Sequence, residues 1–146
     1  MKIFTIGFTQ KPAKEFFEKI KKNEIELLID VRLNNVSQLA GFAKGKDLDY
    51  FLKEICDCKY VHEESLAPTK ELLDSYRAKK TSWLKYENVF NKIIEERKIE
   101  NIFINKYMDY ERVCLLCTEP TAHQCHRRLV AEYLQKNIDG IEIIHI

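Results

Sequence analysis

The chain has 146 residues, which is about the length of one domain. Hydrophobic residues make up 45% of it and charged residues 32%, a balance that favours a globular fold and argues against wholesale disorder. The net charge of +1 gives no support for a general attraction to nucleic acid or to a membrane surface. No apolar run approaches the roughly 20 residues of a membrane span, and residues 1–10 lack a signal-peptide pattern. These features predict a cytoplasmic protein, whose five cysteines serve as thiols, ligands or catalysts rather than as disulfides.

The first part of the chain alternates short apolar runs with amphipathic stretches. Apolar residues at helical spacing indicate buried helix faces, and short continuous apolar runs are typical of strands covered on both sides. The segments expected here, in chain order, are a strand over 2–6, a helix opening at Pro12, a strand over 27–31, a helix capped by Asp47 and a short strand over 60–62.

The second part continues this alternation. Thr121, with Gln124 three residues later, fits a capping box, which places the start of a helix there. The segments expected are a helix carrying Trp83 and Tyr86, a stretch over 99–110 that fits either a strand or a helix, a strand over 113–117, the helix opening near Thr121 and a last strand over 141–146.

Short apolar strands that alternate with amphipathic helices indicate a mostly parallel sheet with helices on both faces. The chain has no internal repeat and no linker-like stretch. We therefore predict a single α/β domain over residues 1–146, a Rossmann-like three-layer sandwich. In such folds ligands bind at the carboxyl ends of the strands, so the polar residues at these ends are the candidates for a site.

Polar residues follow the first two predicted strands. Gly7 permits a close backbone approach, and Thr9 offers a hydroxyl near a helix N-terminus, where anions bind; the alternative is a tight turn with a helix cap. Asp30 and Arg32 lie on the same side of the second strand. Arg32 is a candidate ligand for a phosphate or carboxylate, with Asp30 as its orienter or as a general base. The alternative is an internal ion pair that braces the next loop.

The segment 33–46 has no clear secondary-structure pattern, and long unstructured loops in compact domains are often functional. Its amide and hydroxyl side chains, Asn34 and Ser37 among them, would suit a base or a sugar, with Phe42 stacking on it. The alternative is an ordered surface loop.

The densest group of reactive side chains lies between Cys117 and Arg128, where a buried strand gives way to a helix. Three chemistries compete for it. The first is metal binding, for which the chain supplies enough zinc ligands in Cys114, Cys117, His123, Cys125 and His126. Cys114 and Cys117 are three residues apart in a strand, however, so they point to opposite faces, and we predict no zinc held by both.

The second chemistry is a thiolate nucleophile. Cys117 lies at a strand end before a helix and arginines, a position that lowers a thiol pKa. Asp30-Val31-Arg32 also looks like the strand end of rhodanese-like sulfurtransferases, although the loop after Cys117 is longer and lacks glycine. The third is an anion site in which His126 and Arg127 join Arg32. The structural alternative is that Cys125 and His126 are simply packed along the helix.

Several of these segments together resemble the domain-of-unknown-function family DUF488. The most specific element is Leu116-Cys117-Thr118-Glu119 followed by Cys125-His126-Arg127, and the resemblance covers essentially the whole chain. The family usually carries Gly-His-Ser after the first strand, so Phe8 stands here where an imidazole is usual. The resemblance implies a compact α/β domain of bacterial or archaeal cytoplasm and supplies no reaction. The accompanying elements are Thr5-Ile6-Gly7-Phe8-Thr9, Asp30-Val31-Arg32 and Ile144-His145-Ile146.

The leading hypothesis is an enzyme, either a hydrolase or a transferase, that acts on a phosphate-bearing small molecule, a nucleotide or a nucleic-acid component in a cleft at the strand ends. One alternative is a rhodanese-like sulfur or acyl transferase using Cys117, and another is a non-catalytic zinc- or nucleic-acid-binding module. The sequence assigns no resident metal, no cofactor and no membrane partner. The catalytic candidates are Asp30, Glu119 and Cys117. The candidates for substrate binding are Thr9, Arg32, Asn34, Ser37, Cys125, His126 and Arg127.

Overall fold

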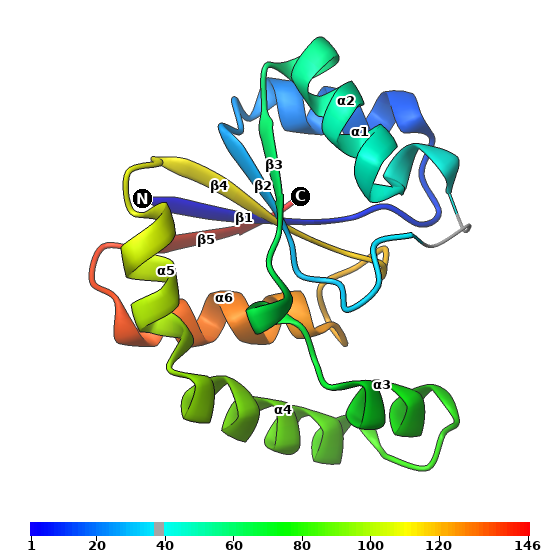
Figure 1. Ribbon diagram of the computed structural model, residues 1–146, viewed down its shortest axis with the longest axis vertical. Helices are drawn as coiled ribbons and strands as arrows, with labels where there is room; N and C mark the ends of the chain where they lie inside the picture. The colour runs from blue at the N-terminus through cyan, green and yellow to red at the C-terminus, as the bar shows by residue number, and fades with distance from the viewer. Residues whose placement is uncertain (37–39) are drawn as a thin grey trace.

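In the computed structural model, which describes residues 1–36 and 40–146, five strands form one parallel sheet in the order β3-β2-β4-β1-β5 (Figure 1). The register pairs Asp30 with Leu116 and Gly7 with Cys117, so the carboxyl ends of β1, β2 and β4 meet at one edge. This edge carries the candidate site. The strands are β1 (Lys2–Gly7), β2 (Leu27–Asp30), β3 (Lys59–His62), β4 (Arg112–Cys117) and β5 (Glu142–His145).

Helices cover both faces of the sheet, as Figure 1 shows. The first two helices, α1 and α2, lie on one face, and α4, α5 and α6 bury their apolar residues on the other. The short helix α3 packs on α4, at the outer end of the second layer. The helices are α1 (Ala13–Lys22), α2 (Gly45–Cys56), α3 (Lys70–Arg77), α4 (Trp83–Arg97), α5 (Ile99–Tyr107) and α6 (His126–Asn137), with 3-10 turns at Gly41–Ala43 and Glu64–Leu66.

Two separate cores follow from the alternation of side chains along the strands. Cys114 packs with Phe16 and Leu48 under α1 and α2, whereas Cys117 packs with Phe90 and Leu129 on the opposite side. The two cysteines of β4 therefore point to opposite faces, as the strand period requires. The predicted α/β sandwich, with a parallel sheet between two helical layers, is confirmed.

Two helix starts differ from the predictions. The helix α6 begins at His126 and not near Thr121, because Cys125 has an extended backbone (φ −141°, ψ 139°) and occupies the N-cap position. No side-chain hydrogen bond caps it, so the predicted capping box is wrong. Helix α2 begins at Gly45 after Lys44 as N-cap, and Asp47 lies in its first turn, where a carboxylate still favours the helix dipole.

Two helices of the structure, α3 and α5, were not predicted from the sequence. The ambiguous stretch after residue 98 forms the helix α5. The helix α3 had no prediction; its N-cap Thr69 accepts a hydrogen bond from the amide of Leu72 at 3.2 Å. Among the residues that the structure describes, no helix is both long enough and apolar enough to cross a membrane.

A buried carboxylate, Glu63, ties the end of β3 to α5. It accepts hydrogen bonds from Tyr107, Lys106 and Ser65. Burial alone would raise the pKa of Glu63, but these three hydrogen bonds outweigh it and hold the pKa below its usual value of 4.5. The ionised form is therefore the one that stabilises the fold.

We predict that Glu63→Gln lowers the free energy of unfolding by about 1–3 kcal/mol at neutral pH, because a carboxylate accepts these bonds better than an amide. A folded-state pKa below the unfolded one means that this stabilisation is present above pH 4.5 and is lost as the pH falls through the folded-state value. Urea unfolding of both proteins from neutral pH to pH 3 measures the difference, and a constant gap over that range would contradict the prediction.

Candidate functional site

A cavity of about 120 Å³ lies at the carboxyl edge of the sheet, where β2 and β4 end and α6 begins. It is bounded on its outer side by α3 and the start of α4. The residues that line it include six of the predicted site residues: Arg32, Asn34, Cys117, Glu119, Cys125 and His126. The strand-end rule thus brings together side chains that are far apart in the sequence.

Arg32 and Asp30 form a buried ion pair at the end of β2. Arg32 donates from Nε to Oδ1 at 2.9 Å and from Nη2 to Oδ2 at 2.7 Å, and Nη2 also donates to the carbonyl of Ala43. Tyr60 donates to the second oxygen of Asp30, so both carboxylate oxygens have partners. Asp30 is fully buried and is not among the residues lining the cavity. Its bonds with Nε and Nη2 fix the orientation of the Arg32 guanidinium, and its burial separates it from solvent.

One nitrogen of the Arg32 guanidinium, Nη1, has no hydrogen-bond partner among the described residues. Although burial acts against the charge, the hydrogen bonds to Asp30 raise the pKa of Arg32, so it stays a cation. Its Nη1 is buried. The ring of Phe8 lies under the group, 4.9 Å from Cζ to the ring centroid. Arg32 is only 3% exposed and is one of the residues that line the cavity.

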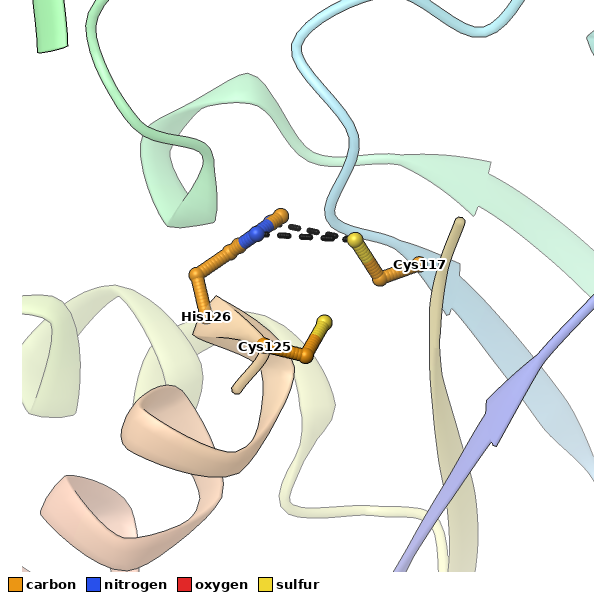
Figure 2. A group of neighbouring side chains, drawn as sticks. All are labelled: Cys117, Cys125 and His126. Atoms are coloured by element: carbon orange, nitrogen blue, oxygen red, sulfur yellow. Dashed lines mark hydrogen bonds between the residues drawn. The ribbon is translucent and has the colours of Figure 1, made fainter. Parts of the chain in front are cut away.

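Cys117, Cys125 and His126 converge at the inner wall of the cavity (Figure 2). Cys117 ends β4, while Cys125 and His126 begin α6, and the sulfur of Cys117 lies 3.5 Å from Nδ1 and 3.7 Å from Nε2 of the imidazole. Nε2 also lies 2.7 Å from the carbonyl oxygen of Val31. A carbonyl only accepts, so Nε2 carries a hydrogen and Nδ1 is free to act as a ligand or an acceptor. Two thiols and an imidazole are a donor set that suits a thiophilic metal.

The two thiols of this cluster differ in acidity. Burial, followed by the hydrogen bond with Cys125, raises the pKa of Cys117 well above that of an ordinary thiol. Burial also opposes ionisation of Cys125, but the hydrogen bonds with Cys117 and His126 and the charge of Arg127 lower its pKa well below the ordinary value. Burial thus opposes ionisation of both sulfurs, and the charge of Arg127 favours it at both, so the two thiols ionise as a linked pair.

Thr9 and Arg127, both predicted to bind substrate, are not among the cavity-lining residues and contact the loop after β4. The hydroxyl of Thr9 donates to the carbonyl of Thr118 at 2.8 Å. Arg127 is 1% exposed and donates from Nη1 to the carbonyl of Glu119 at 2.7 Å and to the sulfur of Cys125 at 3.4 Å. These contacts hold Glu119 and Cys125 in place. The predicted Ser37 lies outside the described residues.

An aromatic wall on the outer side of the cavity was not predicted. Trp83 stacks on Tyr86 at 5.1 Å between ring centroids, with an interplanar angle of 20°, and Tyr76 of α3 packs on both. The spacing of Trp83 and Tyr86 indicated a helix face, but it did not indicate that this face meets a cavity. Among the described residues, the lining residues that the sequence did not predict for the site are Leu33, Leu73, Tyr76, Arg77, Trp83, Tyr86, Thr118 and Gln124.

Comparison with known proteins adds one finding to this geometry. Neither the curated proteins nor the solved structures give a significant match to the chain. The family model described as "Domain of unknown function DUF488" matches residues 12–134. That span contains β2, β4, the loop after β4 and nearly all of α6, and therefore every cavity-lining residue. The match covers well over half of the chain and agrees with the resemblance seen in the motifs, and it shows that the chain belongs to the DUF488 family.

Proposed function

We propose that the protein is an enzyme that acts on a small molecule bearing a phosphate group, with the phosphate held in the cavity at the strand ends. The observation that carries this proposal is that Arg32, which lines the cavity, has a buried Nη1 with no hydrogen-bond partner among the described residues. A buried guanidinium N–H without an acceptor is costly, and an oxyanion is its strongest partner. Arg77, an exposed cation of α3 that also lines the cavity, adds a second positive charge.

The size of the cavity limits what enters it. Its volume is about 120 Å³, whereas an engineered cavity of about 150 Å³ just holds benzene and whole ligand sites usually measure roughly 300–1,000 Å³. A phosphate group fits, and a whole nucleotide does not. The rest of a nucleotide or nucleic-acid component would extend past the exposed side chains of Asn34 and Arg77, where half-buried Trp83 offers a surface for stacking.

Glu119 is the best-placed general acid or base. It lines the cavity and is exposed, so protons exchange with solvent, and Arg127 anchors its carbonyl. In this mechanism Asp30 keeps the role of orienting Arg32, and the Cys117–Cys125–His126 wall shapes the inner end of the site. Arg32 and Arg77 neutralise the charge of the phosphate while Glu119 moves a proton to or from the reacting oxygen.

A prediction at Arg77 tests the anion site without disturbing the core. We expect Arg77→Ala to weaken binding of inorganic phosphate or a nucleoside monophosphate about 10-fold or more, since one charge-assisted hydrogen bond contributes about 1.5–3 kcal/mol. Isothermal titration calorimetry at fixed ionic strength measures this. Lys80→Ala is the matched control, because Lys80 is an exposed cation of the next turn that does not line the cavity. Equal affinities for the two variants, or no binding to the wild type, would place the function elsewhere.

A second candidate is cysteine-dependent transfer of a sulfur or acyl group. The observation in its favour is the position of Cys125 at the N-cap of α6, beside Arg127 and facing the cavity. In this reaction the cysteine sulfur attacks the donor and forms a covalent intermediate, and the donor's leaving group departs. The sequence predicted Cys117 as this nucleophile, and the position of Cys125 makes it a second candidate. Iodoacetamide labelling of metal-free protein at neutral pH, followed by peptide mass spectrometry, identifies the reactive sulfur. If Cys117 and Cys125 were both labelled no faster than Cys56, a half-buried thiol outside the cavity, this candidate would be removed.

A further inference from the structure

We infer that Cys117, Cys125 and His126 form a three-ligand binding site for Zn²⁺, whose fourth coordination position opens into the cavity. The ligand atoms, two sulfurs and one ring nitrogen, lie within 4.8 Å of one another and come from the end of β4 and the start of α6. The inference concerns metal binding alone and holds whether or not the proposed phosphate chemistry is right.

The spacing of the ligand atoms suits a tetrahedral ion. Zn–S bonds of about 2.3 Å and Zn–N bonds of about 2.0–2.1 Å at tetrahedral angles place sulfur and nitrogen about 3.5 Å apart. The distance from the sulfur of Cys117 to Nδ1 is 3.5 Å. That sulfur is almost as close to Nε2, so the imidazole must turn before the lone pair of Nδ1 points at the ion.

The surroundings of the histidine already have the form of an outer coordination shell. A metal-binding imidazole usually donates its other N–H to a carboxylate or a backbone carbonyl, which fixes the tautomer. Nε2 of His126 makes this contact with the carbonyl of Val31 at 2.7 Å. Val31 is held in turn, because its amide donates to the carbonyl of Leu116 at 3.0 Å. Phe90 packs edge-on against the ring from the other side.

A positive charge that favours the deprotonated thiols lies beside the proposed ligands. Zinc binding requires deprotonated thiols, and the positive charge beside them comes from Arg127, whose Nη1 lies 3.4 Å from the sulfur of Cys125. All three ligands are buried, with at most 6% exposure, so the ion would bind away from bulk water. Two thiolates with one imidazole favour zinc over the hard cations Mg²⁺ and Ca²⁺, which prefer oxygen ligands.

The number of ligands distinguishes this site from a closed structural one. Cys114 faces the other core, and the described residues bring only these three metal-binding side chains together. Structural zinc is almost always held by four protein ligands, whereas catalytic zinc keeps one position for water or substrate. The three ligands line the same cavity as Arg32 and Glu119, so the open position would lie in a cavity that these two residues share. A zinc-bound water there would be more acidic than free water.

Cobalt substitution of untagged, reduced and metal-stripped protein tests the site. We expect one equivalent of Co²⁺ to produce intense visible bands of tetrahedral cobalt and a near-ultraviolet thiolate-to-cobalt band, both lost when one equivalent of Zn²⁺ displaces the cobalt. Cys117→Ser and Cys125→Ser should each weaken zinc binding by about 100-fold or more. Cys56→Ser is the matched control, because Cys56 is a half-buried thiol outside the cluster, and its binding should equal that of the wild type.

A second measurement covers the event that a variant fails to fold. In the wild type, Zn²⁺ should slow the alkylation of Cys117 and Cys125 but not that of Cys56, as measured by peptide mass spectrometry. Binding of less than one equivalent of Co²⁺ by the reduced wild type, or equal zinc affinity in the wild type and folded Cys117→Ser, would overturn the inference. So would equal alkylation rates with and without zinc.

Discussion

Gly7→Ala is expected to lower the free energy of unfolding by about 3 kcal/mol or more, as overpacking against rigid backbone does at its upper end. An alanine Cβ at this position would lie 2.6 Å from the carbonyl carbon of Glu119 and closer still to its oxygen. The clashing atoms belong to the backbone, so no side-chain rotation relieves the contact. Either β1 or the loop after β4 must move.

The same substitution reports on the site, because the loop that would move contains Glu119. Gly41→Ala is the control, since a Cβ there meets nothing within 4 Å, and we expect a change of no more than about 0.5 kcal/mol. Urea unfolding measures both variants. If Gly7→Ala were as stable as Gly41→Ala, the close packing of β1 against this loop would be wrong, and with it the position of Glu119.

The sheet and its edge could be predicted because burial on both faces leaves a clear signal. Residues 27–30 and 113–117 are continuous apolar runs apart from Asp30, and both are strands of the sheet. Once the sheet is parallel, the carboxyl ends of neighbouring strands must meet. This argument predicts that Arg32, Cys117 and Glu119 lie close together, and the three residues line one cavity.

The outer wall and the loop before α6 could not be predicted in the same way. Helix α3 has one buried residue, Leu72, so its periodicity gives little signal. The Thr121–Gln124 pair matches a local capping pattern, but helix α6 begins only at His126. There the ring of His126 contacts Cys117 and the carbonyl of Val31, which are distant in the sequence. Local propensity is a weak prior where such tertiary contacts compete with it.

The role of Arg32 could not be predicted, because it depends on which of its guanidinium nitrogens are bonded to neighbouring residues. Spacing placed Asp30 and Arg32 on one side of the strand, which fits both an ion pair and an anion ligand. In the structure Nε and Nη2 donate hydrogen bonds to Asp30 and Ala43, whereas Nη1 has no partner among the described residues. The ion pair therefore uses Nε and Nη2, whereas the proposed anion contact would use Nη1. Residue spacing alone cannot predict this division.

Arg32→Ala is expected to lower the free energy of unfolding by about 3–5 kcal/mol, because it leaves the carboxylate of Asp30 buried without its cation. Asp30 is fully buried, and among the described residues Tyr60 and the amide of residue 32 would remain as donors to its carboxylate. Arg32→Lys should recover part of the loss by restoring the charge. The exposed pair Lys14–Glu18 is the control, and Lys14→Ala should change stability by no more than about 0.5 kcal/mol.

A double-mutant cycle separates the ion pair from the rest of the Arg32 side chain. Because each single substitution strands the other charge, Arg32→Ala combined with Asp30→Ala should be less destabilising than the sum of the two, with a coupling of about 1–3 kcal/mol by urea unfolding. Additive effects would show that the ion pair itself contributes little to stability. With the coupling expected here, a lost activity in Arg32→Ala cannot by itself be assigned to substrate binding, and the anion site is tested at Arg77, whose removal leaves the ion pair intact.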